Sequence, residues 1–350
     1  MFAAGNTVYS DRTLLSVYAQ QIRGLGGDWL PDLVWNFDGS LIASASENSV
    51  QIWDANSGIL LRTLMGHTDK VFSLAWQPTS NILASASADQ TVRIWDGASG
   101  QLVRILTGSS YPISNIFWGT NGQKIFTVSI PEYNELRVWE STTGNLLSVH
   151  NIGTPSNITW NPLGTNFTYV TFGGTLNIVD ATTFRELNSY AVPNSNEYRT
   201  NGILYALTYN SNGTRIATGS VDGTIYVWDG STGAVLLSLG STDNYIPNSF
   251  VIENPLLTWV RDIAFDATGT KLSAITADGT VRVWNAQTGE ILQTTSVAAP
   301  IYTASFSPNG DRIAFAGANN SVAIVPAPSQ FQAATPTPTP TATPAITPTP

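Results

Sequence analysis

The chain has 350 residues with a formal net charge of −9, and only 11% of its residues are charged. This length allows a large buried core, whereas the acidic excess and the scarcity of lysine argue against nucleic acid or an anionic membrane surface as a partner. The absence of cysteine excludes disulfide bonds, thiolate nucleophiles and thiolate metal ligands, and it leaves a cytosolic and an exported location equally open.

The N-terminal stretch MFAAGNTVYSDR lacks a basic cluster followed by an apolar run, and therefore does not resemble a secretory signal. No segment approaches the roughly 18 continuous apolar residues of a membrane span, so we expect no membrane insertion. Residues 11–20, DRTLLSVYAQ, have the pattern of a β-strand. Their core, LLSV, recurs at residues 146–149, in the last strand of a four-strand unit.

An internal repeat occupies most of the chain. Clear copies are ILASASADQTVRIWDGASGQLVRIL (82–106), RIATGSVDGTIYVWDGSTGAVLLSL (215–239) and KLSAITADGTVRVWNAQTGEILQTT (271–295), and weaker copies lie at 41–64, 124–149, 167–190 and 312–325. One position, Trp in most copies, recurs at spacings of 42, 44, 40, 49, 56 and 41 residues. It is held by Trp53, Trp95, Trp139, Val179, Trp228, Trp284 and Val325. Seven such positions predict seven units.

Each unit contains four short apolar or alternating runs, for example residues 71–76, 82–87, 91–95 and 101–106, which we interpret as strands a to d. Many of the turns between them carry Asp-Gly or Asn-Gly, the dipeptides that tolerate the positive φ of tight hairpins. Consecutive strands are therefore predicted to pair antiparallel. The turns concerned are Asp38-Gly39, Asn121-Gly122, Asn212-Gly213, Asp222-Gly223, Asp278-Gly279 and Asn309-Gly310.

The repeat period, endings of the form SxDxTVRIWD and one frame running from Gly66-His67 to Trp95-Asp96 resemble those of WD-repeat β-propellers. The resemblance covers roughly residues 10–325. It implies an all-β fold, a seven-bladed β-propeller with four antiparallel strands in each blade.

The seventh unit has strands near 301–306, 312–316 and 321–325 but no fourth strand. We expect residues 11–20 to complete this last blade, so that the N-terminal strand closes the ring as is common in the family and hides an exposed edge. The alternative is that NTVYS is the remnant of an earlier strand c, in which case the chain is cut from a longer propeller.

Residues 326–350 differ from the propeller at 1–325, because they contain eight prolines and no charged residue. Alternating Thr-Pro favours an extended, solvated chain. The segment resembles the Pro/Thr spacers that hold exported or surface domains away from an anchor, which favours that location slightly. A featureless disordered terminus and a cytoplasmic location stay open.

The resemblance also implies a buried hydrogen-bonded tetrad in the second unit, formed by His67, Ser85, Asp89 and Trp95. A hydrolytic triad is the competing interpretation of the first three residues. We favour a structural role, because a buried network capped by Trp has no room for a substrate. Partial tetrads are expected at Thr218, Asp222 and Trp228 in the fifth unit and at Asp278 and Trp284 in the sixth, while the fourth and seventh units have Val179 and Val325 in place of Trp.

Catalysis requires a base or metal ligands, and the chain has two histidines, His67 and His150. The second ends an outer strand, where a structural role is the simpler interpretation. No HExxH motif, Walker-type loop, nucleophile elbow or dense Asp/Asn calcium frame occurs. We therefore expect no enzyme activity, no cofactor and no metal site. A pair of acids in the channel mouth is the catalytic arrangement left open.

Related propellers usually bind their partners on the face formed by the d-to-a and b-to-c loops. Two d-to-a connections are long here, 191–202 and 240–259. The second is rich in apolar and aromatic residues of the kind that anchor interfaces. The alternative is that these side chains only cap the adjoining blades. The candidate interaction face consists of Asp69, Tyr111, Tyr205, Tyr245, Phe250, Trp259, Arg261 and Tyr302.

The sequence therefore predicts a monomeric ring that acts as a non-catalytic protein-interaction scaffold, binds one or more protein partners and does not bind nucleic acid. The alternative function is an exported or surface-tethered module that binds a ligand such as a glycan and stands on a Thr/Pro stalk.

Overall fold

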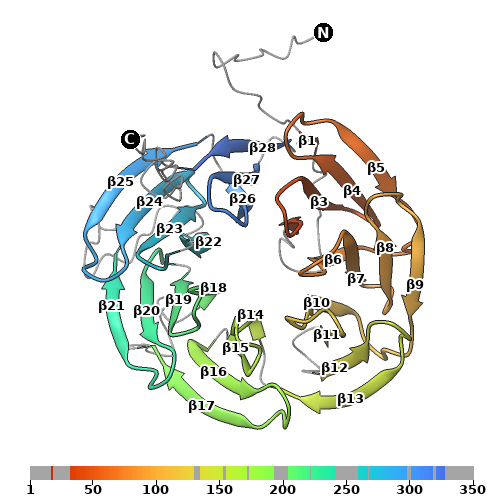
Figure 1. Cartoon of the computed structure of the whole chain (residues 1–350), viewed down its shortest axis with the longest axis horizontal. Helices are drawn as coiled ribbons and strands as arrows, with labels where there is room; N and C mark the ends of the chain where they lie inside the picture. Colours follow the sequence, from red (N-terminus) through yellow and green to blue (C-terminus); the bar gives the residue numbers. More distant parts are fainter. Residues whose placement is uncertain are drawn as a thin grey trace, which may run out of the picture.

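The computed structural model describes residues 17–18, 32–129, 135–152, 155–171, 173–192, 204–220, 222–240, 259–266, 268–297, 301–317 and 321–327. Every regular element in this part of the chain is a β-strand, and the strands form seven four-stranded sheets. The sheets stand side by side in a ring around a central opening (Figure 1). The predicted all-β, seven-bladed propeller is confirmed.

We number the sheets as blades in chain order. Blade 1 consists of β2 (Leu33–Trp35), β3 (Leu41–Ser46), β4 (Ser49–Asp54) and β5 (Leu60–Leu64). Blade 2 consists of β6 (Val71–Trp76), β7 (Ile82–Ser87), β8 (Val92–Asp96) and β9 (Leu102–Leu106). Blade 3 consists of β10 (Ile113–Trp118), β11 (Lys124–Ser129), β12 (Glu135–Glu140) and β13 (Leu146–Asn151). Blade 4 consists of β14 (Pro155–Trp160), β15 (Asn166–Thr171), β16 (Thr175–Asp180) and β17 (Glu186–Ala191).

Blade 5 consists of β18 (Leu204–Tyr209), β19 (Arg215–Ser220), β20 (Ile225–Asp229) and β21 (Val235–Leu239). Blade 6 consists of β22 (Val260–Phe265), β23 (Lys271–Thr276), β24 (Thr280–Asn285) and β25 (Ile291–Ser296). Blade 7 consists of β26 (Ile301–Phe306), β27 (Arg312–Gly317), β28 (Ser321–Pro326) and the short strand β1 (Val17–Tyr18).

In blades 1 to 6 the strands pair antiparallel with their neighbours in the sequence, from the inner strand at the channel to the outer strand at the rim, and in blade 7 the outer strand β1 pairs antiparallel with β28 (Figure 1). The glycines of the six predicted Asp-Gly and Asn-Gly turns all have φ between +68° and +86°. A side chain rarely adopts this left-handed backbone, which is why glycine stands there. The hairpins predicted from these dipeptides are therefore confirmed.

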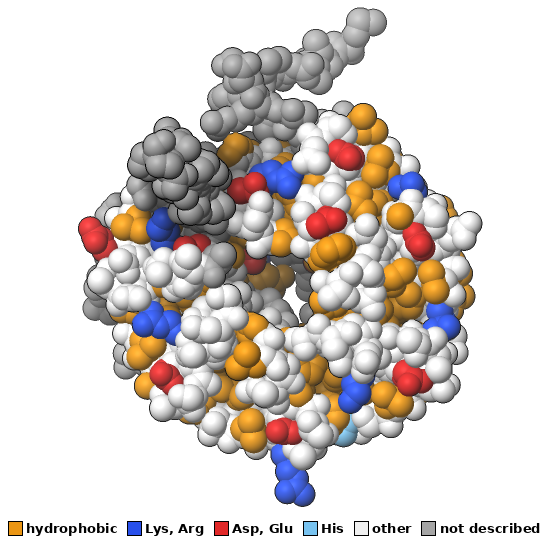
Figure 2. Space-filling model, in the orientation of Figure 1, with side chains coloured by type: hydrophobic (Ala, Val, Ile, Leu, Met, Phe, Trp, Pro, Cys, Tyr) orange, Lys and Arg blue, Asp and Glu red, His pale blue; other side chains and the backbone are white. Residues whose placement is uncertain are grey.

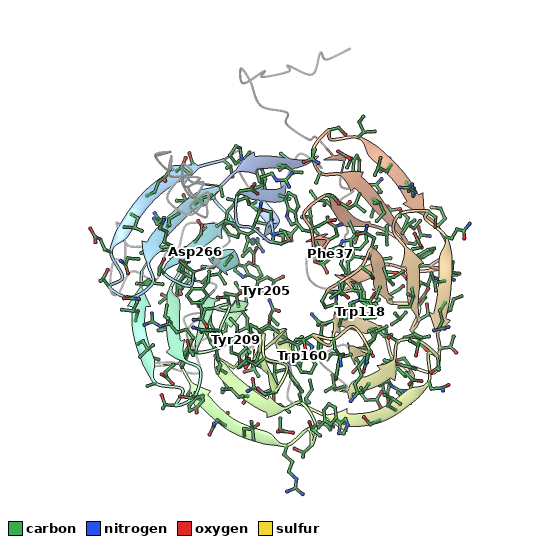
Figure 3. All side chains as sticks on the ribbon, in the orientation of Figure 1. Phe37, Trp118, Trp160, Tyr205, Tyr209 and Asp266 are labelled. Atoms are coloured by element: carbon green, nitrogen blue, oxygen red, sulfur yellow. The ribbon has the colours of Figure 1, made fainter. Side chains whose placement is uncertain are left out.

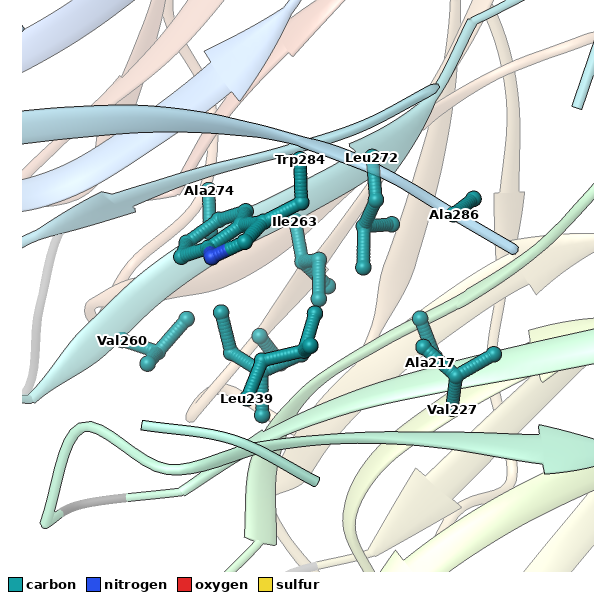
Figure 4. Packing of buried hydrophobic residues seen from close by; sticks show 11 residues of the cluster. Ala217, Val227, Leu239, Val260, Ile263, Leu272, Ala274, Trp284 and Ala286 are labelled. Carbon is teal, nitrogen blue, oxygen red and sulfur yellow. The ribbon is translucent and has the colours of Figure 1, made fainter. Parts of the chain in front are cut away.

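The hydrophobic core lies between neighbouring blades. Between blades 5 and 6, for example, Val227 and Leu239 belong to the same buried cluster as Val260, Ile263 and Trp284 (Figure 4). Both valines are fully buried. Because every blade packs against two neighbours in this way, apolar burial at roughly 25 cal/mol per Å² supports the whole ring.

The last blade contains β1, where Val17 pairs with Val322 and Tyr18 pairs with Ser321. The rest of the predicted strand at 11–20 lies outside the described residues, so closure of the ring by an N-terminal strand of that length stays a prediction. The Thr/Pro segment from residue 328 onward also lies outside them, and the boundary between a propeller at 1–325 and a tail at 326–350 stays a prediction as well. The described residues include no helix long and apolar enough to cross a membrane.

Candidate functional site

Four side chains of blade 2 form a continuous hydrogen-bonded series. Nδ1 of His67 lies 2.8 Å from Oδ2 of Asp89, and Nε2 of His67 lies 2.8 Å from Oγ of Ser85. The indole N–H of Trp95 donates to the same Ser85 oxygen at 2.9 Å. The series ties the segment before β6 to the turn between β7 and β8 and to both of those strands. All four residues of the predicted tetrad are thus brought together.

Burial determines what this series can do chemically. Ser85 is 0% exposed and His67 is 4% exposed. Burial lowers the pKa of His67, against the opposing effect of Asp89. Burial alone would raise the pKa of Asp89, but hydrogen bonds from Thr91 and His67 hold it below its usual value. A neutral imidazole between an ionised carboxylate and an inaccessible hydroxyl is suited to holding strands together, and it offers a substrate no access to Oγ of Ser85.

The Trp-to-hydroxyl hydrogen bond recurs without the histidine in three other blades. Each strand-c Trp donates to a Ser or Thr on strand b of its own blade, at 2.9 to 3.1 Å. The bond supplies a buried indole N–H with the partner it requires. The pairs are Trp53 with Ser44, Trp139 with Thr127, and Trp228 with Thr218.

The predicted partial tetrads are therefore of two kinds. In blade 5, Thr218 and Trp228 are hydrogen bonded, whereas Asp222 accepts from the backbone N–H of Thr224 in its own turn. In blade 6, Trp284 is 3% exposed and stands across from Leu272. Ala274 stands two residues beyond Leu272, at the position where blades 1, 2, 3 and 5 have a Ser or Thr. Blade 6 therefore has no hydroxyl at this position of strand b. Asp278 accepts instead from Thr276 and from the N–H of Thr280.

Blades 4 and 7 lack the strand-c Trp, and each has a large aromatic residue on strand b, at the position that carries the hydroxyl in blades 1, 2, 3 and 5. In blade 4, Val179 pairs with Phe167, and Tyr169 stands two residues further along β15. In blade 7, Val325 pairs with Ile313, and Phe315 stands at the corresponding place in β27. Tyr169 is 5% exposed and Phe315 is 4% exposed. A small residue on strand c is thus matched by a large aromatic residue on strand b, which keeps the core filled.

Three of the predicted interface residues meet between blades 5 and 6. The rings of Tyr205 in β18 and Trp259, just before β22, meet edge to face with centroids 4.8 Å apart. The guanidinium carbon of Arg261 in β22 lies 4.1 Å from the centroid of the Trp259 ring. Nε of Arg261 donates to the carbonyl of Ile301 in blade 7 at 3.1 Å. Tyr205 lies at the inner edge of the ring beside the central opening (Figure 3).

We call Tyr205, Trp259 and Arg261 the mouth cluster. The backbone places it on the face of the d-to-a and b-to-c loops, because the N–H of Ala277 in the b-to-c turn of blade 6 donates to the carbonyl of Trp259 at 2.9 Å. Burial raises the pKa of Tyr205, and the Arg261 charge opposes that effect. Tyr205 and Trp259 are partly exposed and Arg261 is 8% exposed, so the cluster presents an aromatic surface beside the channel with the guanidinium buried against it.

Two other predicted interface residues, Asp69 and Tyr111, have their described hydrogen bonds within blades 2 and 3. The side chain of Asp69 accepts a hydrogen bond from the backbone N–H of Lys70, and its backbone carbonyl accepts one from the hydroxyl of Ser87. Tyr111 precedes β10, and its carbonyl accepts from Ser109. Tyr302 belongs to β26, but its side chain lies outside the described residues, as do Tyr245 and Phe250 entirely.

Two carboxylates on the inner strands are absent from the sequence-based set. Oδ2 of Asp32, just before β2, accepts from the N–H of Leu74 in blade 2 at 2.7 Å. Oδ2 of Asp262 in β22 accepts from the N–H of Phe306 in blade 7 at 3.1 Å. Burial raises the pKa of both groups, and that of Asp262 reaches about 7, with the Asp32 charge contributing. Each carboxylate joins its blade to the next one.

A signal for these carboxylates exists in the aligned repeats. One aligned position at the start of the inner strands is polar in most units, and it is occupied by Asp32, Ser73, Asn115, Asn157, Ala206, Asp262 and Thr303. A polar position that recurs in a buried strand indicates a side chain with a defined hydrogen-bond partner. Among the residues that the structure describes, no three His, Asp or Glu side chains are grouped so that they could hold a metal ion.

The fold and the recurrent Trp-to-hydroxyl pairs define a WD-repeat β-propeller. The family model described as WD domain, G-beta repeat matches residues 20–54, 58–96, 195–229 and 254–285. Each range contains the first three strands of blade 1, 2, 5 or 6 and ends at the residue after its strand-c Trp. The resemblance to WD-repeat propellers, predicted from the repeat period and the Trp-Asp endings, is confirmed by these four matches together with the propeller fold.

Several curated relatives share this repeat. The chain is 29% identical to protein tipD of Dictyostelium discoideum over 213 residues, which cover 59% of this chain and 34% of tipD. It is 28% identical to nuclear distribution protein PAC1 of Arthroderma benhamiae over 271 residues, 77% of this chain and 40% of PAC1. It is 28% identical to autophagy-related protein 16 of Arabidopsis thaliana over 217 residues, 62% of this chain and 42% of that protein. The matched part of this chain spans less than half the length of each of these relatives.

Proposed function

We propose that the chain is a non-catalytic protein-interaction scaffold that binds a protein partner at the mouth cluster. The observation that carries the proposal is the stacked arrangement of Tyr205, Trp259 and Arg261 beside the central opening. Tyr, Trp and Arg are the residue types most enriched among the energetically dominant positions of protein interfaces. A group in which Trp259 contacts both Tyr205 and Arg261 is suited to anchoring a partner.

The energetic advantage of the site is its preorganisation. Trp259 lies between Tyr205 and Arg261, and Nε of Arg261 is held by the Ile301 carbonyl. Side chains that are already ordered lose little conformational entropy on binding, typically about 0.5–1.5 kcal/mol less for each immobilised side chain. The site also joins three successive blades, so the ring itself fixes its geometry.

Two further observations support a scaffold over an enzyme. PAC1 is named as a nuclear distribution protein and the Arabidopsis relative as an autophagy-related protein, and neither name describes a reaction. Among the described residues, His67, Ser85 and Asp89 form the one grouping with the composition of a hydrolytic triad, and Ser85 is 0% exposed. The comparisons give no support to the glycan-binding alternative.

The proposal is tested by crosslinking capture from an extract of the source cells. Four baits are compared: the whole chain, a chain lacking residues 241–257, Trp259→Ala, and Arg185→Ala as the matched control. Arg185 is exposed in the turn between β16 and β17, at the opposite end of the blades from the mouth cluster. A partner captured by the whole chain and by Arg185→Ala but lost with Trp259→Ala supports the proposal. Equal recovery by all four baits overturns it.

A further inference from the structure

The seam between the last and first blades is crossed by one arginine of blade 7. The guanidinium of Arg312, the first residue of β27, donates from Nη1 to the carbonyl of Ala55 at 2.9 Å and to Oδ1 of Asn56 at 3.2 Å. Its Nη2 donates to the carbonyl of Gly39 at 2.8 Å. All three acceptors belong to turns of blade 1. One side chain therefore holds both turns at the same end of the neighbouring blade.

The same arginine is fixed in place by contacts on its other sides. Its Cζ lies 4.8 Å from the ring centroid of Trp35, and its Nε lies 3.4 Å from Oδ1 of Asp311. The side chain of Arg312 is 22% exposed. A guanidinium that is stacked, paired and largely shielded from water makes stronger hydrogen bonds than a freely solvated one.

Trp35 crosses the seam in the opposite direction. Its indole N–H donates to the carbonyl of Ser305 in blade 7 at 3.0 Å. The same seam contains a buried hydrophobic cluster, which includes Leu33, Trp35 and Ile42 of blade 1 and Ala314 and Ile324 of blade 7. Thus the seam has both a polar clasp and an apolar core, formed by inner and middle strands and independent of β1.

A second arginine makes the same kind of hydrogen bond between two other neighbouring blades. Arg215 is the first residue of β19, as Arg312 is of β27, and its Nη1 donates to the carbonyl of Ala286 in blade 6. Ala286 directly follows β24, as Ala55 directly follows β4. The first-to-last seam is therefore fastened in the same way as an interface inside the ring, and with more hydrogen bonds from the arginine.

We propose that Arg312 and Trp35 close the ring, so that β1 can leave the edge of β28 without opening the seam. The described pairing of β1 with β28 consists of Val17 with Val322 and Tyr18 with Ser321. Those contacts lie at the outer rim, whereas the Arg312 clasp and the Trp35 core lie on the inner and middle strands. The outer strand of blade 7 is then an exchangeable element, and the closed ring is the stable unit.

Hydrogen exchange measured by mass spectrometry separates the two modes of closure. The proteins compared are the whole chain, a chain lacking residues 1–20, Arg312→Ala, Arg312→Lys and Arg215→Ala. Peptides covering β2–β3 and β27 report on the seam, those covering β28 report on the outer edge, and those covering blade 3 serve as the internal reference. The radius of gyration from X-ray scattering reports whether the ring stays closed.

We expect Arg312→Ala to lower the protection of β2–β3 and β27 roughly ten- to hundred-fold, because the backbone carbonyls of the buried residues Ala55 and Gly39 lose this donor and Asn56 loses its contact with blade 7. Arg312→Lys keeps the charge but not the planar fork, and it should show a smaller loss at the same peptides, which tests the clasp if the Ala variant does not fold. Arg215→Ala should change the interface of blades 5 and 6 and leave the seam protected.

Removal of residues 1–20 should raise exchange in β28 while β2–β3, β27 and the radius of gyration stay as in the whole chain. The proposal is overturned if that truncation exposes β2–β3 and β27, or expands the ring, to the extent expected for Arg312→Ala. It is also overturned if both Arg312 variants leave the seam peptides as protected as before.

Discussion

The hydroxyl oxygen of Tyr209 in blade 5 lies 2.5 Å from Oγ1 of Thr168 in blade 4. Tyr209 ends the inner strand of its blade, at the place held by a tryptophan in each of the first four blades. Trp118, for example, donates from its indole N–H to the carbonyl of Ala75 in the preceding blade at 2.9 Å. In blades 1, 2, 3 and 5 the aromatic residue at this place therefore donates or shares a hydrogen bond with the preceding blade.

Trp160 is an exception to this rule. Its buried Nε1 has no hydrogen-bond partner in the structure. It lies instead among phenylalanines, with ring centroids 4.9 Å from Phe126 and 6.1 Å from Phe117. Trp118, Trp160 and Tyr209 all lie on the inner half of the ring (Figure 3). The interface of blades 3 and 4 is consequently held by aromatic packing without that hydrogen bond.

This difference predicts losses of different size from the same Trp-to-Phe substitution at the two positions. Trp118→Phe removes the donor of a hydrogen bond between two blades, so we expect a loss of about 0.5–1.5 kcal/mol in the free energy of unfolding beyond the change in packing. Trp160→Phe removes an N–H that already lacks a partner, and its cost should be limited to the lost ring volume. Chemical denaturation of the two variants measures the difference. Equal losses would refute the assigned role of the indole N–H.

The compensating pair in blade 4 predicts a non-additive double mutant. Val179→Trp alone overpacks the site against Tyr169, and Tyr169→Ser alone leaves a cavity; we expect losses of about 1–3 and about 3–5 kcal/mol respectively. The double variant restores the arrangement of Trp95 and Ser85 in blade 2, and it should be more stable than the sum of the single variants by at least about 1 kcal/mol. Additive losses in a denaturation cycle would contradict the volume exchange.

The tetrad of blade 2 predicts a contrast between two fully buried serines. Ser85→Ala removes the acceptor of the Trp95 N–H and the partner of His67 Nε2, and should lower the free energy of unfolding by about 1–3 kcal/mol. Ser273 is also 0% exposed, but its hydroxyl has no hydrogen-bond partner. Ser273→Ala should therefore be neutral or stabilising. Thermal unfolding of both variants checks the contrast, and a large loss from Ser273→Ala would contradict it.

The raised pKa of Asp262 predicts a specific dependence of stability on pH. Because its pKa is about 3.8 in the unfolded chain and about 7 in the folded chain, the folded state binds more protons between these values. The contribution of this group is fully present below pH 3.8 and is lost as the pH rises to 7. Asp262→Asn mimics the protonated form and should remove that decline, which amounts to at most a few kcal/mol.

The measurement is the difference in free energy of unfolding between the whole chain and Asp262→Asn at several pH values from 4 to 8. His67 contributes the opposite slope in both proteins, because its lowered pKa makes the folded state less stable as the pH falls below about 6.5. That contribution cancels in the difference. A difference that stays constant across the range would show that Asp262 does not titrate there.

The repeat pattern was sufficient to predict the ring of blades but insufficient to predict the side-chain contacts between strands and between blades. Strands and hairpins follow from alternation and from Asn-Gly or Asp-Gly turns, whose physics is local. The exchange of Trp for Tyr169 or Phe315 is not local, because it links positions on different strands whose register the sequence does not display. The roles of Asp262 and Arg312 depend on which blade is the neighbour, which only the closed ring defines.

The candidate site was predicted in part for the same reason. Tyr205 and Arg261 were identified because they stand near the starts of inner strands, which face the channel mouth, and Trp259 was identified as an aromatic residue of the long connection 240–259. Their mutual stacking could not be foreseen, because Tyr205 comes from blade 5 and the other two residues from blade 6. Figure 2 shows that charged side chains are sparse and scattered on the displayed face around the central opening, in keeping with the low charge of the sequence.

Binding of a purified partner to Trp259→Ala tests the proposed function most directly. Once a partner has been identified by capture, its dissociation constant is measured by calorimetry with the whole chain, with Trp259→Ala and with Arg185→Ala. A binding site centred on the mouth cluster predicts a loss of affinity of about 30-fold or more for Trp259→Ala and an unchanged affinity for Arg185→Ala. Equal affinity of all three proteins, each shown to be folded, would contradict the account.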